Sequence, residues 1–109
     1  MLSNMATAKV INLRELIEYQ EGAVVSRTIL ETETGTVTLF AFTVGQGLSE
    51  HTAPFDALVY LLEGEADVSL SGQTLRVHEG EFVIMPANDP HALKAVKNFK
   101  MLLIMLQSP

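Results

Sequence analysis

From Gly22 to its end, the chain is a succession of short apolar segments separated by turns, and this pattern limits the fold more than any other feature. Gly-containing turns or an Asn-Asp-Pro turn lie between most of the segments. Short strands separated by Gly-centred turns are typical of antiparallel sandwiches and barrels. We therefore expect an all-β fold with the strands 23–33, 36–44, 57–63, 66–71, 73–77, 81–86, 91–96 and 99–106.

Two of the expected strands, at 57–62 and 101–106, are apolar on both faces. An antiparallel strand with one wet face should alternate between apolar and polar residues, so these two strands need cover on both sides. One face can line a barrel, and the other must pack on a second sheet or a second subunit. Leaving such a face wet exposes a larger patch than soluble monomers usually tolerate, and we therefore expect a homodimer.

The N-terminal residues differ in character from the rest of the chain. Residues 1–9 are small and polar without a clear period, which predicts a loose arm. Asn12 is a good helix N-cap, and Glu15 three residues later completes a capping-box pattern. We expect this arm and one short helix over 1–22, and a single barrel domain over 23–107, because 109 residues suffice for one core only.

The composition argues against several classes of binding partner and excludes cysteine-based chemistry. The formal net charge is −6 with only seven Lys and Arg, so we expect neither nucleic acid nor an anionic membrane as a partner. The lack of cysteine excludes thiolate ligands, thiol nucleophiles and disulfides. There is no leader pattern and no apolar run near the roughly 18 residues that span a bilayer, which makes the cytoplasm the expected location.

One histidine-containing segment carries the first half of a family resemblance. Gly45, His51 and Gly64 fall at the spacing of the first motif of the cupins, which are small barrels also called RmlC-like. Ala53 stands where that motif has its second His, and Ala57 stands where it has its Glu. The chain thus keeps the two glycines and the first His of this motif but lacks two of its metal ligands.

A second segment carries the other half of the resemblance. Gly80, Pro86 and His91 match the second cupin motif in register. Asn88 replaces a Gly of that motif, and Ala95 replaces its Asn. The metal-ligating His of the second motif is therefore kept.

The resemblance covers roughly residues 23–106 and implies the cupin double-stranded β-helix, a jelly-roll barrel of the cupin 2 type. In that family three imidazoles and one carboxylate hold a transition metal inside the barrel and leave positions open for water or substrate. Here Ala53 and Ala57 occupy two of those four positions, and strand parity should still turn them inward. The implied site is therefore incomplete.

The resemblance places His51 and His91 as neighbours inside the barrel. Asp56 is the nearest replacement for a third ligand, although it needs a local bulge, which Pro54 makes possible. The candidate metal site is thus His51, His91 and Asp56, and the candidate cofactor is a divalent Ni, Zn, Mn or Fe ion.

The wall around the two histidines is expected to be apolar. His78 is expected to face solvent, and Met101 and Met105 are expected to fill the core. We expect the pocket to be lined by Phe40, Phe42, Phe55, Val59, Val83 and Met85, and we take His51, Phe55, Val59, Met85 and His91 as the candidate ligand-binding residues.

Three functions fit these features. The first is a cupin that binds a small molecule in its central pocket, through a weak divalent metal site in one form of the hypothesis. The second is a metal-dependent dioxygenase or isomerase that uses His51 and His91. The third is a non-catalytic dimeric module. Metal content separates the second from the others, and a ligand-dependent rise in melting temperature separates the first from the third.

Overall fold

A computed structural model describes residues 7–107 of the chain, which form nine β-strands and one short 3-10 helix. The all-β prediction is confirmed. No helix in this described part is both long and apolar enough to cross a membrane. The elements are η1 (Leu13–Glu15), β1 (Val24–Thr32), β2 (Gly35–Phe42), β3 (Gly47–His51), β4 (Phe55–Glu63), β5 (Glu65–Leu70), β6 (Gln73–His78), β7 (Phe82–Met85), β8 (His91–Ala95) and β9 (Phe99–Gln107).

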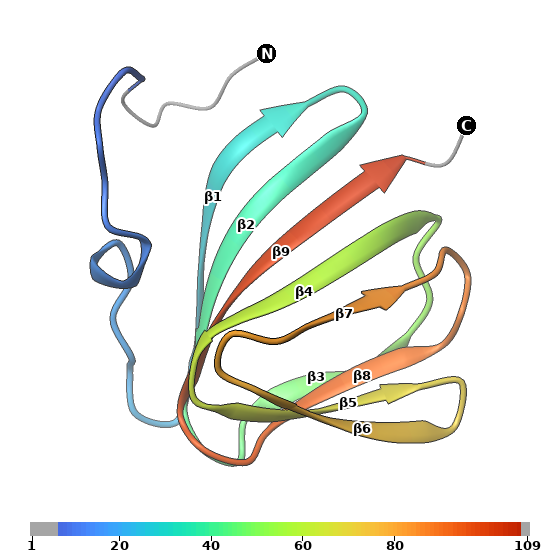
Figure 1. The fold of residues 1–109 in the computed structure, drawn as a ribbon. Coiled ribbons are helices and arrows are strands. Elements are labelled where there is room, and N and C mark those ends of the chain that lie inside the picture. Colours follow the sequence, from blue (N-terminus) through green and yellow to red (C-terminus); the bar gives the residue numbers. More distant parts are fainter. Residues whose placement is uncertain (1–6, 108–109) are drawn as a thin grey trace.

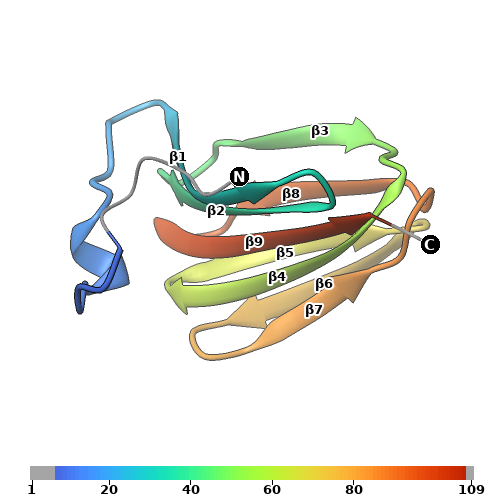
Figure 2. The same cartoon turned by 90° about the horizontal axis from the view of Figure 1, so that it is seen from above.

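The strands form two antiparallel sheets that face each other as a jelly roll. The larger sheet has the order β1-β2-β9-β4-β7, and the smaller sheet has the order β3-β8-β5-β6. In Figure 1 the sheets come together at the β4–β5 turn and diverge toward the end at which β3 leads into β4. Figure 2 shows the strands of both layers running nearly side by side. The diverging end is where the barrel opens.

The core fills the space between the two sheets. Along β4, Ala57, Val59 and Leu61 are buried and alternate with less buried residues, as expected of a strand with one face in the core. Phe42 and Phe99 stack with ring centroids 4.4 Å apart and are fully buried. Larger aromatic and aliphatic side chains thus close the barrel below its mouth.

The expected N-terminal helix is only a three-residue 3-10 turn. Asn12 caps it, and its Oδ1 accepts a hydrogen bond from Arg14 N at 3.0 Å. After the turn, Ile17 and Tyr19 pack against the outer face of the larger sheet, and Lys100 Nζ donates to Arg14 O at 2.6 Å. Because a short isolated helix is marginal in water, these contacts with the sheet decide the conformation. Residues 1–6 of the expected arm lie outside the described residues.

The sequence pattern did not predict β3, although this strand carries His51. Its sequence, GLSEH, has a single large apolar residue, and four of its five residues are exposed. It is an edge strand that pairs only with β8, and its register shifts between Leu48 and His51. Because most of its residues and one of its edges are open to water, this strand lacks the apolar alternation that identifies the others.

Candidate functional site

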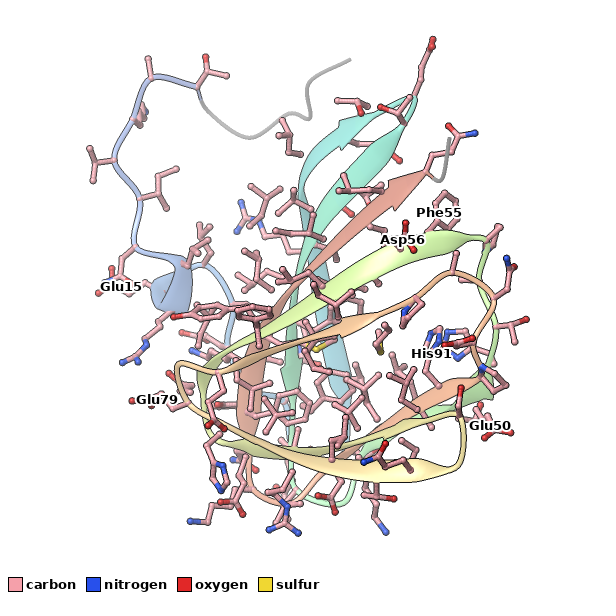
Figure 3. All side chains as sticks on the ribbon, turned by 45° about the vertical axis from the view of Figure 1, so that its right-hand side comes forward. Glu15, Glu50, Phe55, Asp56, Glu79 and His91 are labelled. Atoms are coloured by element: carbon pink, nitrogen blue, oxygen red, sulfur yellow. The ribbon has the colours of Figure 1, made fainter. Side chains whose placement is uncertain are left out.

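The two histidines of the cupin motifs lie side by side at the open end of the barrel. His51 ends β3 and His91 begins β8, and they are partners in the antiparallel register. Their ring centroids are 4.3 Å apart, with the ring planes at 65°. His91 is buried, at 7% exposure, whereas His51 is exposed. Figure 3 shows His91 between the sheets at this end. The pair therefore lies at the boundary between the buried interior of the barrel and the solvent.

Backbone carbonyls hold both rings in the same tautomer. Nδ1 of His51 lies 2.8 Å from Ser49 O, and Nδ1 of His91 lies 3.0 Å from Asp89 O. A carbonyl oxygen can only accept a hydrogen bond, so each Nδ1 is the donor. In the neutral ring the lone pair is then on Nε2. Both imidazoles are thus prepared to bind an ion or a hydrogen-bond donor through Nε2.

The two alanines that replace family ligands still line the pocket. Ala57 is buried and Ala53 is partly buried, and both belong to the pocket wall that contains the histidines. β4 pairs with β9 in unbroken register from Phe55 to Leu61, so no bulge turns Ala57 away. The inward direction expected for both positions is the one observed.

Asp56 does not join the histidines, contrary to the proposed third-ligand position. It lies on the opposite face of β4 from Ala57 and is exposed, because the regular strand alternates there. Its Oδ1 accepts a hydrogen bond from Ala87 N at 3.0 Å, and nearby Asn88 N donates to Ala53 O at 2.8 Å. The carboxylate therefore helps to hold the β7–β8 loop at the barrel mouth (Figure 3).

The loop at the mouth also explains one departure from the second motif. Asn88 stands at the motif's Gly position and has a φ of 69°. Asn tolerates this left-handed conformation better than most residues with a side chain. The replacement therefore preserves the shape of the loop that leads into His91.

The enclosed part of the pocket is small, with a volume of about 50 Å³. Four residues expected in the pocket wall are absent from its lining and pack in the core, namely Phe40, Phe42, Val59 and Val83. Met101 and Met105, expected as core filler, do line it. The wall consists of Leu48, His51, Ala53, Phe55, Ala57, Met85, His91, Leu93, Met101, Leu103 and Met105.

This wall does not fit the metal set of the family. It offers two imidazoles but no carboxylate, whereas the family set has three imidazoles and one carboxylate. Within residues 7–107, no group of three or more His, Cys, Asp or Glu side chains could hold a metal ion. A divalent ion at this site would lose its hydration shell without gaining a negatively charged ligand, which is energetically costly.

His78, the third histidine, lies on the outside of the barrel, as expected. It is exposed, and its Nδ1 lies 3.0 Å from Glu81 Oε1 while its Nε2 lies 3.3 Å from Glu65 Oε1. The hydrogen bonds from His78 hold the pKa of Glu81 below its usual value. His78 therefore belongs to a surface charge cluster rather than to the pocket.

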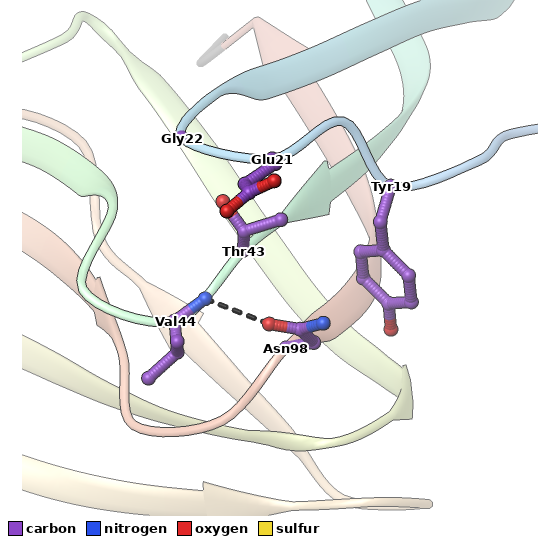
Figure 4. Close-up of a pocket in the computed structure, with 6 residues that line it drawn as sticks. All are labelled: Tyr19, Glu21, Gly22, Thr43, Val44 and Asn98. Atoms are coloured by element: carbon purple, nitrogen blue, oxygen red, sulfur yellow. Dashed lines mark hydrogen bonds between the residues drawn. The ribbon is translucent and has the colours of Figure 1, made fainter.

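Figure 4 shows a second hollow, with a volume of about 550 Å³, at the other end of the barrel. It lies where β9 begins, whereas the histidine pocket lies where β9 ends beside Phe55. Val44 N donates to Asn98 Oδ1 at 2.8 Å across its floor. The hollow is open and marks the junction between the N-terminal segment and the barrel. Its lining is Tyr19, Glu21, Gly22, Thr43, Val44 and Asn98.

Comparison with known proteins settles the family. The family model described as "Cupin domain" matches residues 38–106, which include both histidine segments. The chain belongs to the cupin family. This cupin is also similar to solved structures over nearly its whole length. A conserved protein of unknown function from Streptococcus pyogenes is 35% identical, with 99% of this chain and 95% of that chain covered and a TM-score of 0.93.

Two further solved structures support the assignment. A cupin superfamily protein from Desulfitobacterium hafniense is 30% identical, with 99% of both chains covered and a TM-score of 0.91. A cupin 2 conserved barrel domain protein from Leptotrichia buccalis is 42% identical over 89% of this cupin and 47% of that chain, with a TM-score of 0.86. No curated protein matches the chain.

Proposed function

We propose that this cupin is a binding protein in which His51 and His91 take one compact ligand at the mouth of the barrel. The arrangement of the pair carries the proposal. The rings are 4.3 Å apart, and each Nδ1 donates to a backbone carbonyl. Both Nε2 atoms are thereby left to bind the same ion or hydrogen-bond donor.

The size of the pocket limits the ligand. Its enclosed volume is about 50 Å³. Pockets for drug-sized ligands measure about 300–1,000 Å³. The enclosed part therefore takes an ion, a water-sized group or one end of a longer molecule.

The alternative function is a metal-dependent dioxygenase or isomerase built on the same pair. Catalytic metal sites usually have three protein ligands together with an open position. The wall supplies two imidazoles, and Asp56 lies on the other face of β4. Binding through the pair needs no third ligand, so it is the function that the geometry supports better.

Thermal melting of the untagged full-length chain tests the proposal. The probes are divalent Ni, Zn, Mn and Fe, monovalent Ag, and small organic anions. A probe that binds the pair should raise the melting temperature, because a ligand present at about 100 times its Kd stabilises the folded state by about 2.7 kcal/mol. The gain should be lost in His51→Ala and His91→Ala and kept in the control His78→Ala.

Two outcomes would contradict the proposal. One is a panel in which no probe stabilises the wild type, which would favour a module without a ligand. The other is a stabilising probe that acts equally on all three histidine variants.

A further inference from the structure

We propose that the histidine pair binds a soft monovalent metal ion of the Cu(I) type, and that methionine thioethers complete the coordination of this ion. The inference rests on the proposed function, since it uses the same two Nε2 atoms. It adds Met85 and Met105 as ligands, and these residues have no counterpart among the family's metal ligands.

The strand register places these two methionines around one position of the site. Ala57 pairs with Met85 on β7 on one side and with Met105 on β9 on the other. The three residues form one rung of the larger sheet, and all of them line the pocket that contains His51 and His91. The thioethers thus flank the position at which the family has its carboxylate.

Met101 adds a third thioether deeper in the same wall. It precedes Met105 by four residues on β9, so both share one face of the strand, and it is fully buried. The chain has five methionines, and three of them line this one pocket. Methionine is an adaptable core residue, but simple filling does not require it to gather opposite two imidazoles that present Nε2.

The chemistry of this wall selects against hard and divalent ions. Its side-chain donors are imidazole nitrogens and thioether sulfurs, and every other side chain in it is Ala, Leu or Phe. Thioethers are soft ligands that select Cu(I), whereas carboxylates, carbonyls and water suit Mg, Ca and Mn. A neutral donor set in an apolar pocket also favours one positive charge over two, because burying a charge without an opposite one is costly. Two nitrogens and one or two sulfurs match Cu(I).

Anaerobic titration of the metal-free full-length chain with Cu(I), in competition with a chromogenic Cu(I) chelator, tests the proposal. We expect one Cu(I) per chain, bound more tightly than Zn(II) by about a hundredfold or more. His91→Ala should abolish tight binding. Met85→Leu with Met105→Leu should weaken it by roughly tenfold or more, since the soft ligands are lost while the side-chain size is nearly kept. The control His78→Asn should bind as the wild type does.

X-ray absorption of the Cu(I) complex provides a second readout that does not depend on the folding of any variant. Scattering from both nitrogen and sulfur neighbours supports the proposal. Nitrogen neighbours alone, or unchanged affinity in the double methionine variant, would overturn the thioether ligands. Zn(II) bound through the histidines as tightly as Cu(I) would overturn the preference for a soft ion. In both cases the histidine-pair function would stand. If no probe, ion or organic anion depends on the pair, the inference and the proposed function both fail.

Discussion

At the scale of single residues, Ala53 and Ala57 occupy positions at which the family has two of its four metal ligands. Both methyl groups line the pocket beside His51 and His91, at the positions of a family histidine and glutamate. Ala53→His with Ala57→Glu should therefore create a divalent metal site. Without metal the variant should be less stable by roughly 1–3 kcal/mol, because larger side chains and an unpaired carboxylate enter the pocket. Added Mn, Ni or Zn should recover that stability, as measured by thermal melting.

The matched control for this variant is Ala53→His with Ala57→Gln. It has nearly the same volume but no carboxylate, so it should gain clearly less from metal. A double variant that responds to divalent ions no better than wild type would mean that the two positions do not converge on the histidine pair.

Gly64 illustrates a second residue-scale constraint, which is a close backbone approach. Its φ is 88°, and a Cβ there would meet Asn98 O at 2.0 Å. Gly45 has a similar φ of 87°, but nothing lies within 4 Å of its Cβ position. Both changes to Ala should cost about 1–2 kcal/mol of backbone strain, and Gly64→Ala should cost more because of the clash. Urea unfolding measures the difference, and equal losses would contradict the clash.

The residue-scale predictions from sequence succeeded where a motif fixed both spacing and direction. His51, His91 and the two alanines were placed by the cupin motifs, and the structure gathers all four around one pocket. Met101 and Met105 could not be assigned to the pocket, because β9 is apolar on both faces and its pattern does not say which face is inside. Pro54 suggested a bulge for Asp56, but an unbroken β4 register keeps that carboxylate outside.

At the scale of elements, the N-terminal segment is held to the barrel by polar contacts as well as by apolar packing. Tyr19 donates a hydrogen bond to Glu63 Oε2 at 2.6 Å, and Lys100 Nζ lies 5.1 Å from the centre of the Tyr19 ring. Burial, together with the hydrogen bond and charge of Glu63, raises the pKa of Tyr19 above its ordinary value. The stability that the segment between η1 and β1 gives to the fold should therefore fall at alkaline pH.

The direction in which stability changes with pH follows from whether the folded or the unfolded chain keeps the Tyr19 proton. The folded chain keeps the Tyr19 proton at a pH at which the unfolded chain, with a tyrosine pKa of about 10, loses it. The stabilisation is complete below about pH 10 and falls as the pH rises further. Tyr19→Phe should lose about 1 kcal/mol at neutral pH, through the missing hydrogen bond, and should show a shallower alkaline fall. Urea unfolding at several pH values measures both effects.

Tyr60→Phe is the control for this prediction, because it leaves the bond between Tyr19 and Glu63 intact. Its unfolding free energy should fall with alkaline pH more steeply than that of Tyr19→Phe. Parallel pH profiles for the two variants would argue against the role of Tyr19.

The sequence predicted most elements because their apolar alternation is a direct consequence of having one face in the core. The short strand β3 lacks that alternation, since it is an exposed edge, and only the motif indicated that His51 belongs to the barrel. The N-terminal turn has a correct cap at Asn12 but no α-helix after it, because packing on the sheet outweighs a weak local preference. Local signals therefore fail where tertiary contacts set the conformation.

At the scale of the whole molecule, the outer face of the larger sheet is apolar beyond what the N-terminal segment covers. Leu58 on β4 pairs with Ile84 and Ile104, and in the next row Tyr60 pairs with Phe82. The side chains on this face that stay most exposed are Phe82 at 60%, Ile84 at 55% and Leu106 at 58%. This outward row is the second apolar face noted for β4 and β9 in the sequence.

We propose that this face pairs with the same face of a second copy, because a continuous apolar patch on a sheet is characteristic of an interface. Burying the exposed part of each large side chain contributes up to roughly 1.5–3 kcal/mol, and a stable dimer needs about 800 Å² buried on each subunit, so the whole outer face has to take part. Light scattering at micromolar concentration should give the mass of two 11.9 kDa chains. A single-chain mass for the wild type would exclude the dimer.

Substitution on the face identifies the surface that holds the two copies together. Phe82→Glu with Ile84→Glu should produce a monomer, because each copy would place charges against the apolar face of the other. Val44→Glu is the control, since Val44 is equally exposed, at 62%, but lies in the loop after β2 and away from this face. A dimer that survives the first change and dissociates with the second would place the interface at the other end of the barrel.

The dimer should also affect metal binding. Phe82 and Ile84 lie on β7, the strand that contains Met85, so a dimer through this face would stabilise the strand that supplies one of the proposed thioethers. Loss of the dimer should therefore weaken Cu(I) binding, which the same competition titration would measure.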